Sequence, residues 1–214
     1  MRGFVHQNRH PRIIAGSGPD VGKTIVSAIL TTLMDGDYWK PIQCGDEENS
    51  DTATIKKWID TTRHHIHPPA YSFKAPLSPH HAARLEHISI DPNSITIPQT
   101  KRPLIIESVG GIFVPLTTKV LTIDLFKSWG CKWIVVSRHY IGSINHTLLT
   151  ISALKQHRVP IAGIIFNGEL NPDSEAAILD IAQIPLLGRL LPEADFNSQT
   201  ITRYATQWQP SLLL

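Results

Sequence analysis

The segment GSGPDVGKT, residues 16–24, contains the residue types of a phosphate-binding loop. In such loops glycines let the backbone approach phosphate oxygens, a lysine reaches the β and γ phosphates, and a Ser or Thr hydroxyl binds Mg²⁺. Lys23 and Thr24 supply the lysine and the hydroxyl. The usual spacing, G-x-x-x-x-G-K-[ST], would place a first glycine at position 17, where this chain has Ser17 between two glycines. An ordinary glycine turn capped by Asp20 or Thr24 is the alternative interpretation.

Three further charged side chains follow or precede apolar segments. Lys40 opens the segment KPIQCG (40–45), Asp51 lies in NSDT (49–52), and Glu107 ends the run PLIIE. Ligands of open α/β sheets gather at the carboxyl ends of the strands, so these groups would face the phosphate loop. Two carboxylates and the Thr24 hydroxyl would form an oxygen shell for Mg²⁺. The alternatives are a solvated lysine at the end of a strand and an aspartate that caps a helix.

The elements that must position these side chains alternate between short apolar runs and helical patterns. Such alternation is typical of an α/β fold with a mainly parallel sheet flanked by helices in three layers. The first run, the glycine segment and the first helix follow in the order that a phosphate loop requires. Residues 67–98 form the main irregular region. The predicted strands are 12–15, 37–42, 103–107, 132–137, 160–167 and 185–188, and the predicted helices are about 24–34, 50–59, 122–129, 145–157, 172–182 and 197–207.

Length and composition favour one globular domain spanning residues 1–214. Hydrophobic residues make up 42% and charged residues 18% of the chain, and the net charge is +2, which indicates neither a nucleic-acid partner nor a membrane partner. Two cysteines cannot build a disulfide framework, and no apolar segment has the pattern of a signal peptide or a membrane span. We therefore expect a cytoplasmic protein. The histidines of HHIH (64–67) are interpreted as surface residues rather than as a metal site.

Eight segments, in order, carry a resemblance to the dethiobiotin synthetase family along nearly the whole chain. They are SGPDVGKT, KPIQCG, NSDT, APLSPHHAA, IESVGGIFVPL, YIGSINHTLLT, GIIFNGE and PLLG. The resemblance implies a P-loop-type fold, a homodimer, Mg²⁺, and the substrates ATP, CO₂ and 7,8-diaminononanoate. In the family's reaction an amine becomes a carbamate, ATP phosphorylates it, and the second amine closes the ureido ring of dethiobiotin.

The resemblance also implies roles for individual residues, all numbered here in this sequence. Lys40 and Lys23 would be catalytic, and Thr24, Asp51 and Glu107 would hold the metal. The nucleotide would contact Asp20, Val21, Gly22, Lys23, Thr24, Ile25, Asp51, Glu107, Gly110, Asn167, Leu191 and Pro192. The diamine substrate would contact Cys44 and Ser78, and its carboxylate would reach Gly142, Ser143, Ile144 and Asn145 of the partner subunit.

Some positions depart from the family's pattern. Pro19 replaces a threonine and Cys44 a serine, while Ser108 and Val109 stand in a segment that is commonly EGAGG. These changes suggest weaker substrate binding or a slower enzyme, so a nucleotide-binding relative with reduced activity is one alternative. A regulatory ATPase of the ParA/MinD type is another, although such proteins usually carry an additional lysine early in the loop, where this chain has Ser17 and a glycine.

Overall fold

Parallel pairing joins most of the strands into one sheet. In the computed structural model, which describes residues 10–45, 48 and 50–212, seven of the described strands pair in parallel in the order β4-β2-β6-β1-β7-β8-β9. This arrangement confirms the predicted mainly parallel sheet. The strands are β1 (Arg12–Gly16), β2 (Asp37–Trp39), β4 (Ile66–His67), β6 (Leu104–Gly111), β7 (Lys132–Arg138), β8 (Ile161–Asn167) and β9 (Leu186–Leu190).

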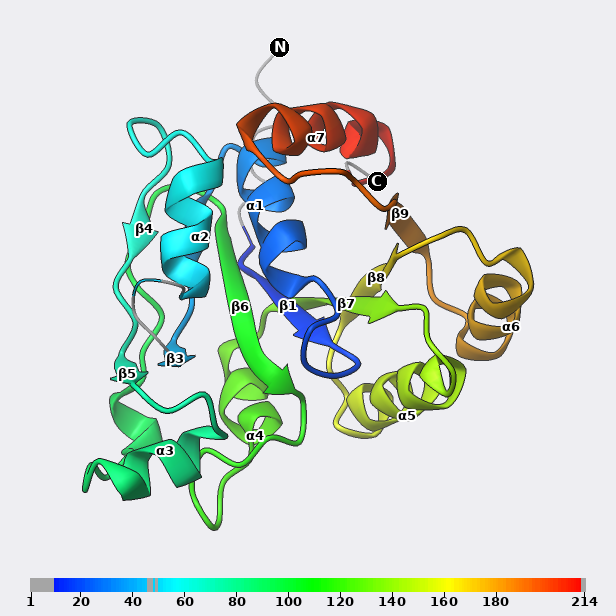
Figure 1. Cartoon of the computed structure of the whole chain (residues 1–214). Coiled ribbons are helices and arrows are strands. Elements are labelled where there is room, and N and C mark those ends of the chain that lie inside the picture. The colour runs from blue at the N-terminus through cyan, green and yellow to red at the C-terminus, as the bar shows by residue number, and fades with distance from the viewer. Residues whose placement is uncertain (1–9, 46–47, 49, 213–214) are drawn as a thin grey trace.

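Helices cover both faces of this sheet, which gives the three predicted layers (Figure 1). Ile14, Ile105 and Ile134 pack toward α1 (Lys23–Leu33), α2 (Asp51–Trp58) and α7 (Ser198–Leu212). Their strand neighbours Ile13 and Ile106 pack on the opposite face, toward α4 (Thr122–Phe126), α5 (Ser143–Gln156) and α6 (Pro172–Ala182). Successive strand residues point to opposite faces, so each central strand is apolar on both sides.

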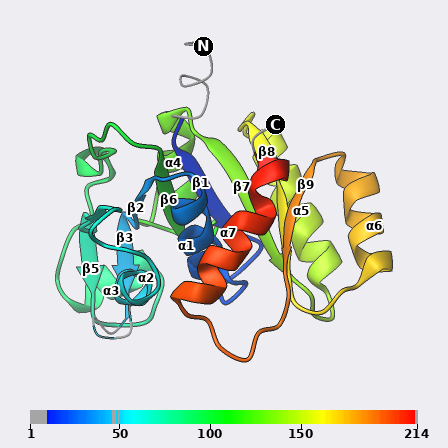
Figure 2. The ribbon, with the colours of Figure 1, turned by 90° about the horizontal axis from the view of Figure 1, so that it is seen from above.

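The predicted strand 37–42 is confirmed only as far as Trp39, where the chain leaves the main sheet. The next residues form β3 (Ile42–Cys44), which pairs with β5 (Tyr71–Phe73) in a separate two-stranded sheet. Pro41 lies at the break and has no N–H to donate to a ladder. Its carbonyl instead accepts the N–H groups of Ala70 and Tyr71. The small sheet lies at the opposite end of the molecule from β9 and α6 (Figure 2).

The remaining predicted elements are confirmed, with ends that differ by a few residues. Helix α5 begins at Ser143, two residues before the predicted start, because Gly142 at φ 97° serves as its N-cap. The region 67–98 is more regular than predicted. Besides β5 it contains α3 (Pro79–Leu85) and the short 3₁₀ helix η1 (Pro92–Ser94), and a second 3₁₀ helix, η2 (Lys127–Trp129), follows α4.

Two of the three histidines in HHIH are buried, so their interpretation as surface residues is wrong. His64 is 4% exposed, with Nδ1 2.8 Å from the carbonyl oxygen of Gly36, and His67 is 9% exposed beside Asp37. His67 lies on β4, the edge strand next to β2. Across the described residues, no group of three or more His, Cys, Asp or Glu side chains is arranged to hold a metal ion.

Of the helices that the structure describes, none combines the length and the apolar character needed to cross a bilayer.

Candidate active site

Four polar side chains meet where β2 and β6 end and α1 begins. The Lys40 ammonium contacts a carboxylate oxygen of Asp51 and lies 3.1 Å from Glu107 Oε1. The Thr24 hydroxyl lies 2.5 Å from Asp51 Oδ1 and 3.0 Å from the same Glu107 oxygen. The structure therefore brings together the lysine, the hydroxyl and the two carboxylates that the sequence predicted to be neighbours.

Strand register explains why Lys40 and Glu107 meet. Tyr38 on β2 lies opposite Ile105 on β6, and both side chains pack on the α1 face. Residues two positions further along each strand point the same way. Lys40 and Glu107 occupy these positions, so both are directed at the start of α1 and are 6% and 1% exposed.

Asp51 reaches the cluster from the start of α2. Ser50 is the N-cap of this helix, and its side chain accepts the N–H of Ala53 at 3.1 Å. Asp51 is the first helical residue and not the cap. Its carboxylate is therefore available to Lys40 and Thr24.

The electrostatics of the cluster favour the charged forms of Lys40 and Asp51. Burial alone would lower the pKa of Lys40, but Glu107 and Asp51 outweigh burial and raise that pKa above its ordinary value. Burial opposes ionisation of Asp51, but Lys40 and the Thr24 hydroxyl lower its pKa. Burial also lowers the pKa of Lys23, although both carboxylates act in the other direction. The site therefore holds a lysine ammonium in contact with carboxylates in a largely dry environment.

The segment 16–24 forms a tight loop between β1 and α1. The Lys23 ammonium donates to the carbonyl of Gly18 at 2.9 Å, across the loop. A Cβ at Gly16 would lie 2.6 Å from that carbonyl oxygen and 3.0 Å from the Lys23 nitrogen, so this glycine is required by close approach. The N-cap of α1 is Gly22, without a side-chain hydrogen bond, so neither Asp20 nor Thr24 caps the helix. The loop is built around Gly16, one position before the usual pattern.

Asn167 holds this loop from the end of β8. Its amide nitrogen donates to the Val21 carbonyl at 2.8 Å, and a Cβ at Gly22 would lie 2.5 Å from the same nitrogen. Val21 itself is 2% exposed, so its side chain is buried in the core. Leu191 and Pro192 follow β9, and the Leu191 N–H donates to the Tyr204 hydroxyl.

A cavity of about 920 Å³ opens over the cluster. Eight of the twelve residues predicted to bind the nucleotide line it, namely Asp20, Gly22, Lys23, Thr24, Ile25, Asp51, Glu107 and Gly110. The predicted catalytic Lys40 and the predicted diamine contacts Cys44 and Ser78 line it as well, whereas Val21, Asn167, Leu191 and Pro192 do not. Of the positions that depart from the family pattern, Pro19, Cys44 and Val109 line the cavity, whereas Ser108 is fully buried outside it. Burial raises the pKa of the Cys44 thiol to about 11, although Lys40 acts to lower it.

The donor set fits a hard cation. Thr24 has a single hydroxyl proton and cannot donate it fully to Asp51 and Glu107 at once, and its hydroxyl and one oxygen of each carboxylate meet at one point. Mg²⁺ prefers such oxygen ligands, takes few of them from protein, and completes its shell with water and phosphate oxygens. Thr24, Asp51 and Glu107 can hold such an ion, whose remaining ligands would come from the nucleotide.

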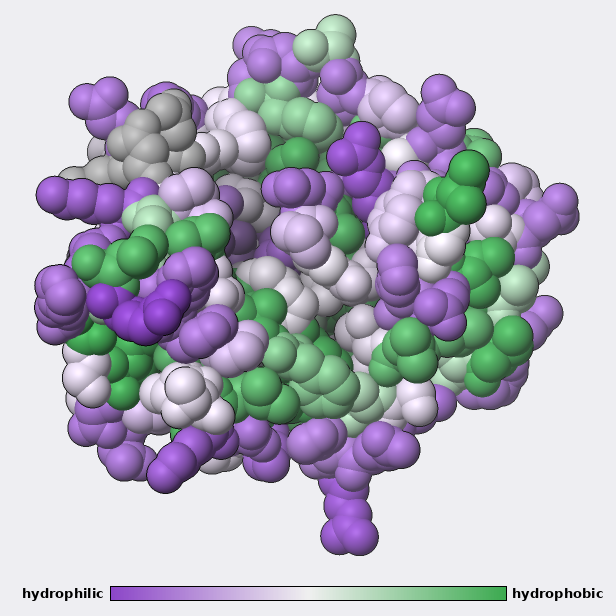
Figure 3. Space-filling view, turned by 60° about the horizontal axis from the view of Figure 1, so that its bottom comes forward, coloured by the Kyte–Doolittle hydropathy of each residue, from purple (hydrophilic) through white to green (hydrophobic). Residues whose placement is uncertain are grey.

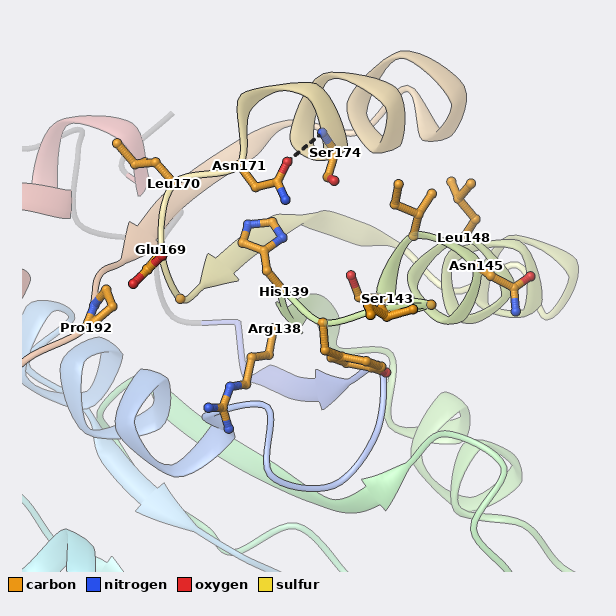
Figure 4. Close-up of a pocket in the computed structure, with 15 residues that line it drawn as sticks. Arg138, His139, Ser143, Asn145, Leu148, Glu169, Leu170, Asn171, Ser174 and Pro192 are labelled. Carbon is orange, nitrogen blue, oxygen red and sulfur yellow. Dashed lines mark hydrogen bonds between the residues drawn. The ribbon is translucent and has the colours of Figure 1, made fainter.

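A second cavity, of about 1090 Å³, lies at the other side of the phosphate loop (Figure 4). It is lined by residues predicted to bind the substrate carboxylate, Gly142, Ser143, Ile144 and Asn145, and by Pro192. These residues do not line the cavity over Lys40. One subunit therefore does not bring the two predicted parts of the diamine site together.

Sequence reasoning missed two neighbours of the site. The Tyr38 hydroxyl donates to Glu107 Oε2 at 2.9 Å, and Arg138 extends from the end of β7 toward the phosphate loop, 3.5 Å from the Asp20 carbonyl (Figure 4). Tyr38 looks like an ordinary core residue of a strand, two positions before a polar one. The only available signal was this spacing, which places its side chain on the same face as Lys40.

Comparisons with known proteins identify relatives of this chain. A family described as "AAA domain" matches residues 12–200. The chain is 43% identical to the ATP-dependent dethiobiotin synthetase of Chlamydia pneumoniae, over 92% of this chain and 88% of the relative. It is 42% identical to that of Christiangramia forsetii, over 93% and 96%.

Solved structures show the same fold at low sequence identity. The cell division ATPase MinD of Pyrococcus furiosus superimposes with a TM-score of 0.56 at 14% identity, covering 94% of this chain and 99% of that one. A plasmid partition protein of Borrelia burgdorferi gives 0.58 at 12%, covering 95% and 96%. These likenesses establish the P-loop fold alone. The sequence relatives, at 42–43% identity, establish the family. The chain belongs to the ATP-dependent dethiobiotin synthetase family.

Proposed function

We propose that this chain converts 7,8-diaminononanoate, CO₂ and ATP into dethiobiotin in the cavity over Lys40. The observation that carries the proposal is the buried contact of Lys40 with Asp51 and Glu107 beside the phosphate loop. A lysine held there by two carboxylates is suited to a reaction in which the carbamate and the phosphates are anionic. The family membership supports the same activity.

The chain's own residues would supply positioning and charge. Lys23 would bind the β and γ phosphates, and Lys40 would hold the carbamate oxygen against the γ phosphate during transfer. Both ammonium groups neutralise charge in a buried site, where such interactions are stronger than in water. The second amine then attacks the carbamoyl carbon, phosphate leaves, and the ring closes, so no protein nucleophile is required.

We assign Mg²⁺ to Thr24, Asp51 and Glu107. Their oxygen donors support this assignment. When bound, the ion would neutralise phosphate charge and orient the γ phosphate. The residues' own contribution is to fix three oxygens at the end of the phosphate loop.

The diamine would lie between the two ends of a site shared by two subunits. Cys44 and Ser78 line the cavity near Lys40, and the carboxylate would lie beyond the aliphatic chain of the substrate. The start of α5 suits a carboxylate, because a helix N-terminus favours anions. The Ser143 N–H itself donates to the Tyr140 carbonyl, so the N–H groups of Ile144 and Asn145 would serve the ligand. Since Gly142 and Asn145 do not line the cavity over Lys40, they would serve the site of the partner.

Exposed apolar side chains support a homodimer. Apolar areas interrupt the polar surface in Figure 3, and Ile141, beside Gly142, is fully exposed. Other exposed large apolar residues are Leu77, Leu85, Ile88, Phe113, Tyr140, Leu149, Leu170, Ile181 and Leu191. Contiguous exposed apolar patches mark protein interfaces, and Tyr140 and Ile141 are adjacent exposed residues just before α5. Cys44 and Cys131 are free thiols, which supports a reducing, cytoplasmic location.

The ParA/MinD-type switch has less support. Its structural likeness is at 12–14% identity and concerns the fold alone. A nucleotide-binding relative with reduced activity is the other alternative, motivated by Pro19, Cys44 and Val109 in the cavity.

One assay tests the proposal against both alternatives. The protein is incubated with diaminononanoate, bicarbonate, Mg²⁺ and ATP, and dethiobiotin is measured by mass spectrometry, with a Lys40→Gln variant as control. We expect diamine-dependent ADP release and a dethiobiotin peak that is nearly lost in the variant. ATP hydrolysis that ignores the diamine would favour a switch, and nucleotide binding without product would favour the inactive relative.

A further inference from the structure

Tyr38 contacts the carboxylate of Glu107 from below the site. Its side chain is fully buried in β2, and its hydroxyl donates to Glu107 Oε2 at 2.9 Å. The other oxygen, Oε1, is the one that faces Lys40 at 3.1 Å and Thr24 at 3.0 Å. The two carboxylate oxygens therefore have separate partners, one in the core and one in the site.

The position of this hydroxyl is fixed by the fold. Tyr38 pairs with Ile66 of β4 on one side and with Ile105 of β6 on the other, so its backbone lies inside the sheet. Its ring belongs to the same buried cluster as Ile29 of α1 and Ile55 of α2. A ring held on all sides has one orientation, so the hydroxyl is a rigid donor.

The chemistry of the contact makes it directional. The Tyr38 phenol is the donor and the Glu107 carboxylate is the acceptor, so the hydrogen bond runs from the core to Oε2. Donors behind the ligands of a metal ion fix their orientation, and loss of such a donor typically reduces metal affinity or activity by about 10-fold to 100-fold.

We propose that Tyr38 is a positioning residue that holds Glu107 Oε2 in the core and thereby presents Oε1 to the metal and to Lys40. The inference rests on the proposed metal role of Glu107. It assigns a function to a residue that otherwise resembles ordinary core packing. Without the hydroxyl, Glu107 keeps its charge but loses the contact that separates its two oxygens.

The test replaces the hydroxyl alone. Tyr38→Phe keeps the ring and its packing, and Tyr71→Phe is the matched control, because Tyr71 also uses its hydroxyl, toward Ser94 and the N–H of Asp91, outside the site. Mn²⁺, as a probe for Mg²⁺, is titrated by electron paramagnetic resonance into each protein with a non-hydrolysable ATP analogue. Urea unfolding of each variant reports any general loss of stability.

We expect Tyr38→Phe to weaken Mn²⁺ binding about 10-fold, with Tyr71→Phe unchanged. In a Glu107→Gln background the same Tyr38 change should matter less than about twofold, because it acts through the carboxylate. Unchanged Mn²⁺ affinity in Tyr38→Phe, or an equal loss in the Glu107→Gln background, overturns the inference.

Asp51→Asn distinguishes a failure of this inference from a failure of the proposed metal site. If Asp51→Asn loses Mn²⁺ while Tyr38→Phe does not, the metal shell stands and only the role of Tyr38 fails. If the unaltered protein binds no Mn²⁺ with nucleotide, the shell fails, and the inference with it.

Discussion

Lys40 and Glu107 form an ion pair inside the protein, with Nζ 3.1 Å from Oε1 and side-chain exposures of 7% and 1%. Two buried charges at this distance are stable only because each has further partners, Asp51 for the lysine and Tyr38 for the carboxylate. We propose that the pair is a preformed site for anions on the lysine side and for a cation on the carboxylate side.

Replacing Lys40 should separate catalysis from nucleotide binding. We expect Lys40→Gln to reduce kcat about 100-fold or more while the KM for ATP changes little, because the charge acts chiefly in the transition state. Steady-state ADP release at saturating diamine measures both constants. Weak ATP binding with nearly normal kcat would assign the lysine to the nucleotide instead.

The two carboxylates should control the metal requirement. Asp51→Asn and Glu107→Gln should each raise the Mg²⁺ concentration needed for half-maximal activity by about 10-fold or more, because each removes a charged oxygen ligand. Asp180→Asn, an exposed change on α6, is the matched control. Circular dichroism checks the fold, and normal Mg²⁺ dependence in both site variants would contradict the shell.

Glycine at position 16 should be needed more than glycine at position 18. Gly16→Ala places a Cβ against the Gly18 carbonyl and the Lys23 nitrogen, whereas a Cβ at Gly18 meets nothing within 4 Å. We expect Gly16→Ala to cost about 1–3 kcal/mol of stability from overpacking and to weaken ATP binding. Gly18→Ala should do much less. Urea unfolding and ATP-analogue titration compare the two variants, and equal effects would mean that the loop relaxes freely.

The Cys44 thiol should be slow to react near neutral pH. A pKa of about 11 lies above the usual value, so the reactive thiolate is scarce below it, roughly one part in a thousand at pH 8. Alkylation by iodoacetamide should therefore rise about 10-fold per pH unit from 7.5 to 9.5 without a plateau. Peptide mass spectrometry separates Cys44 from Cys131, which is 1% exposed and should react more slowly. A plateau near pH 8.5 would indicate an ordinary thiol.

Subunit mixing should reveal whether the site is shared. Lys40→Gln and Asn145→Asp chains, each nearly inactive alone, should regain activity together, because one of the two sites in a mixed dimer combines an intact lysine with an intact α5 start. Dimer exchange is verified independently with tagged chains. Asn145→Ala alone should raise the KM for the diamine more than that for ATP. No recovery after confirmed exchange would mean that each subunit builds its own site.

Much of the site could be predicted because its groups follow recognisable local patterns. Lys23 and Thr24 are adjacent in a strand, loop and helix, and Glu107 ends a run of buried type. The break at Pro41 was missed because the partner of β3 is β5, about thirty residues later, and pairing at that distance leaves no local pattern. The hydroxyl of Tyr38 was missed because a buried tyrosine in a strand has the pattern of core packing.

The buried histidines are a second case in which contacts between distant parts of the chain left no local pattern in the sequence. In the sequence His64 and His67 belong to a polar, proline-adjacent segment, which predicts exposure. Their burial depends on contacts with Gly36 and Asp37, which belong to another part of the chain. Tertiary contacts of this kind override local composition.

The hydrogen bond from Asn167 to Val21 joins positions 146 residues apart, and it has a consequence for synthesis of the chain. Translation proceeds from the N-terminus, so the phosphate loop is made before the amide that holds it. Thr24 and Glu107, 83 residues apart, likewise come together only after β6 has been made. A nascent chain that ends before β8 should therefore lack a properly held phosphate loop, so ATP should stabilise only chains that include β8.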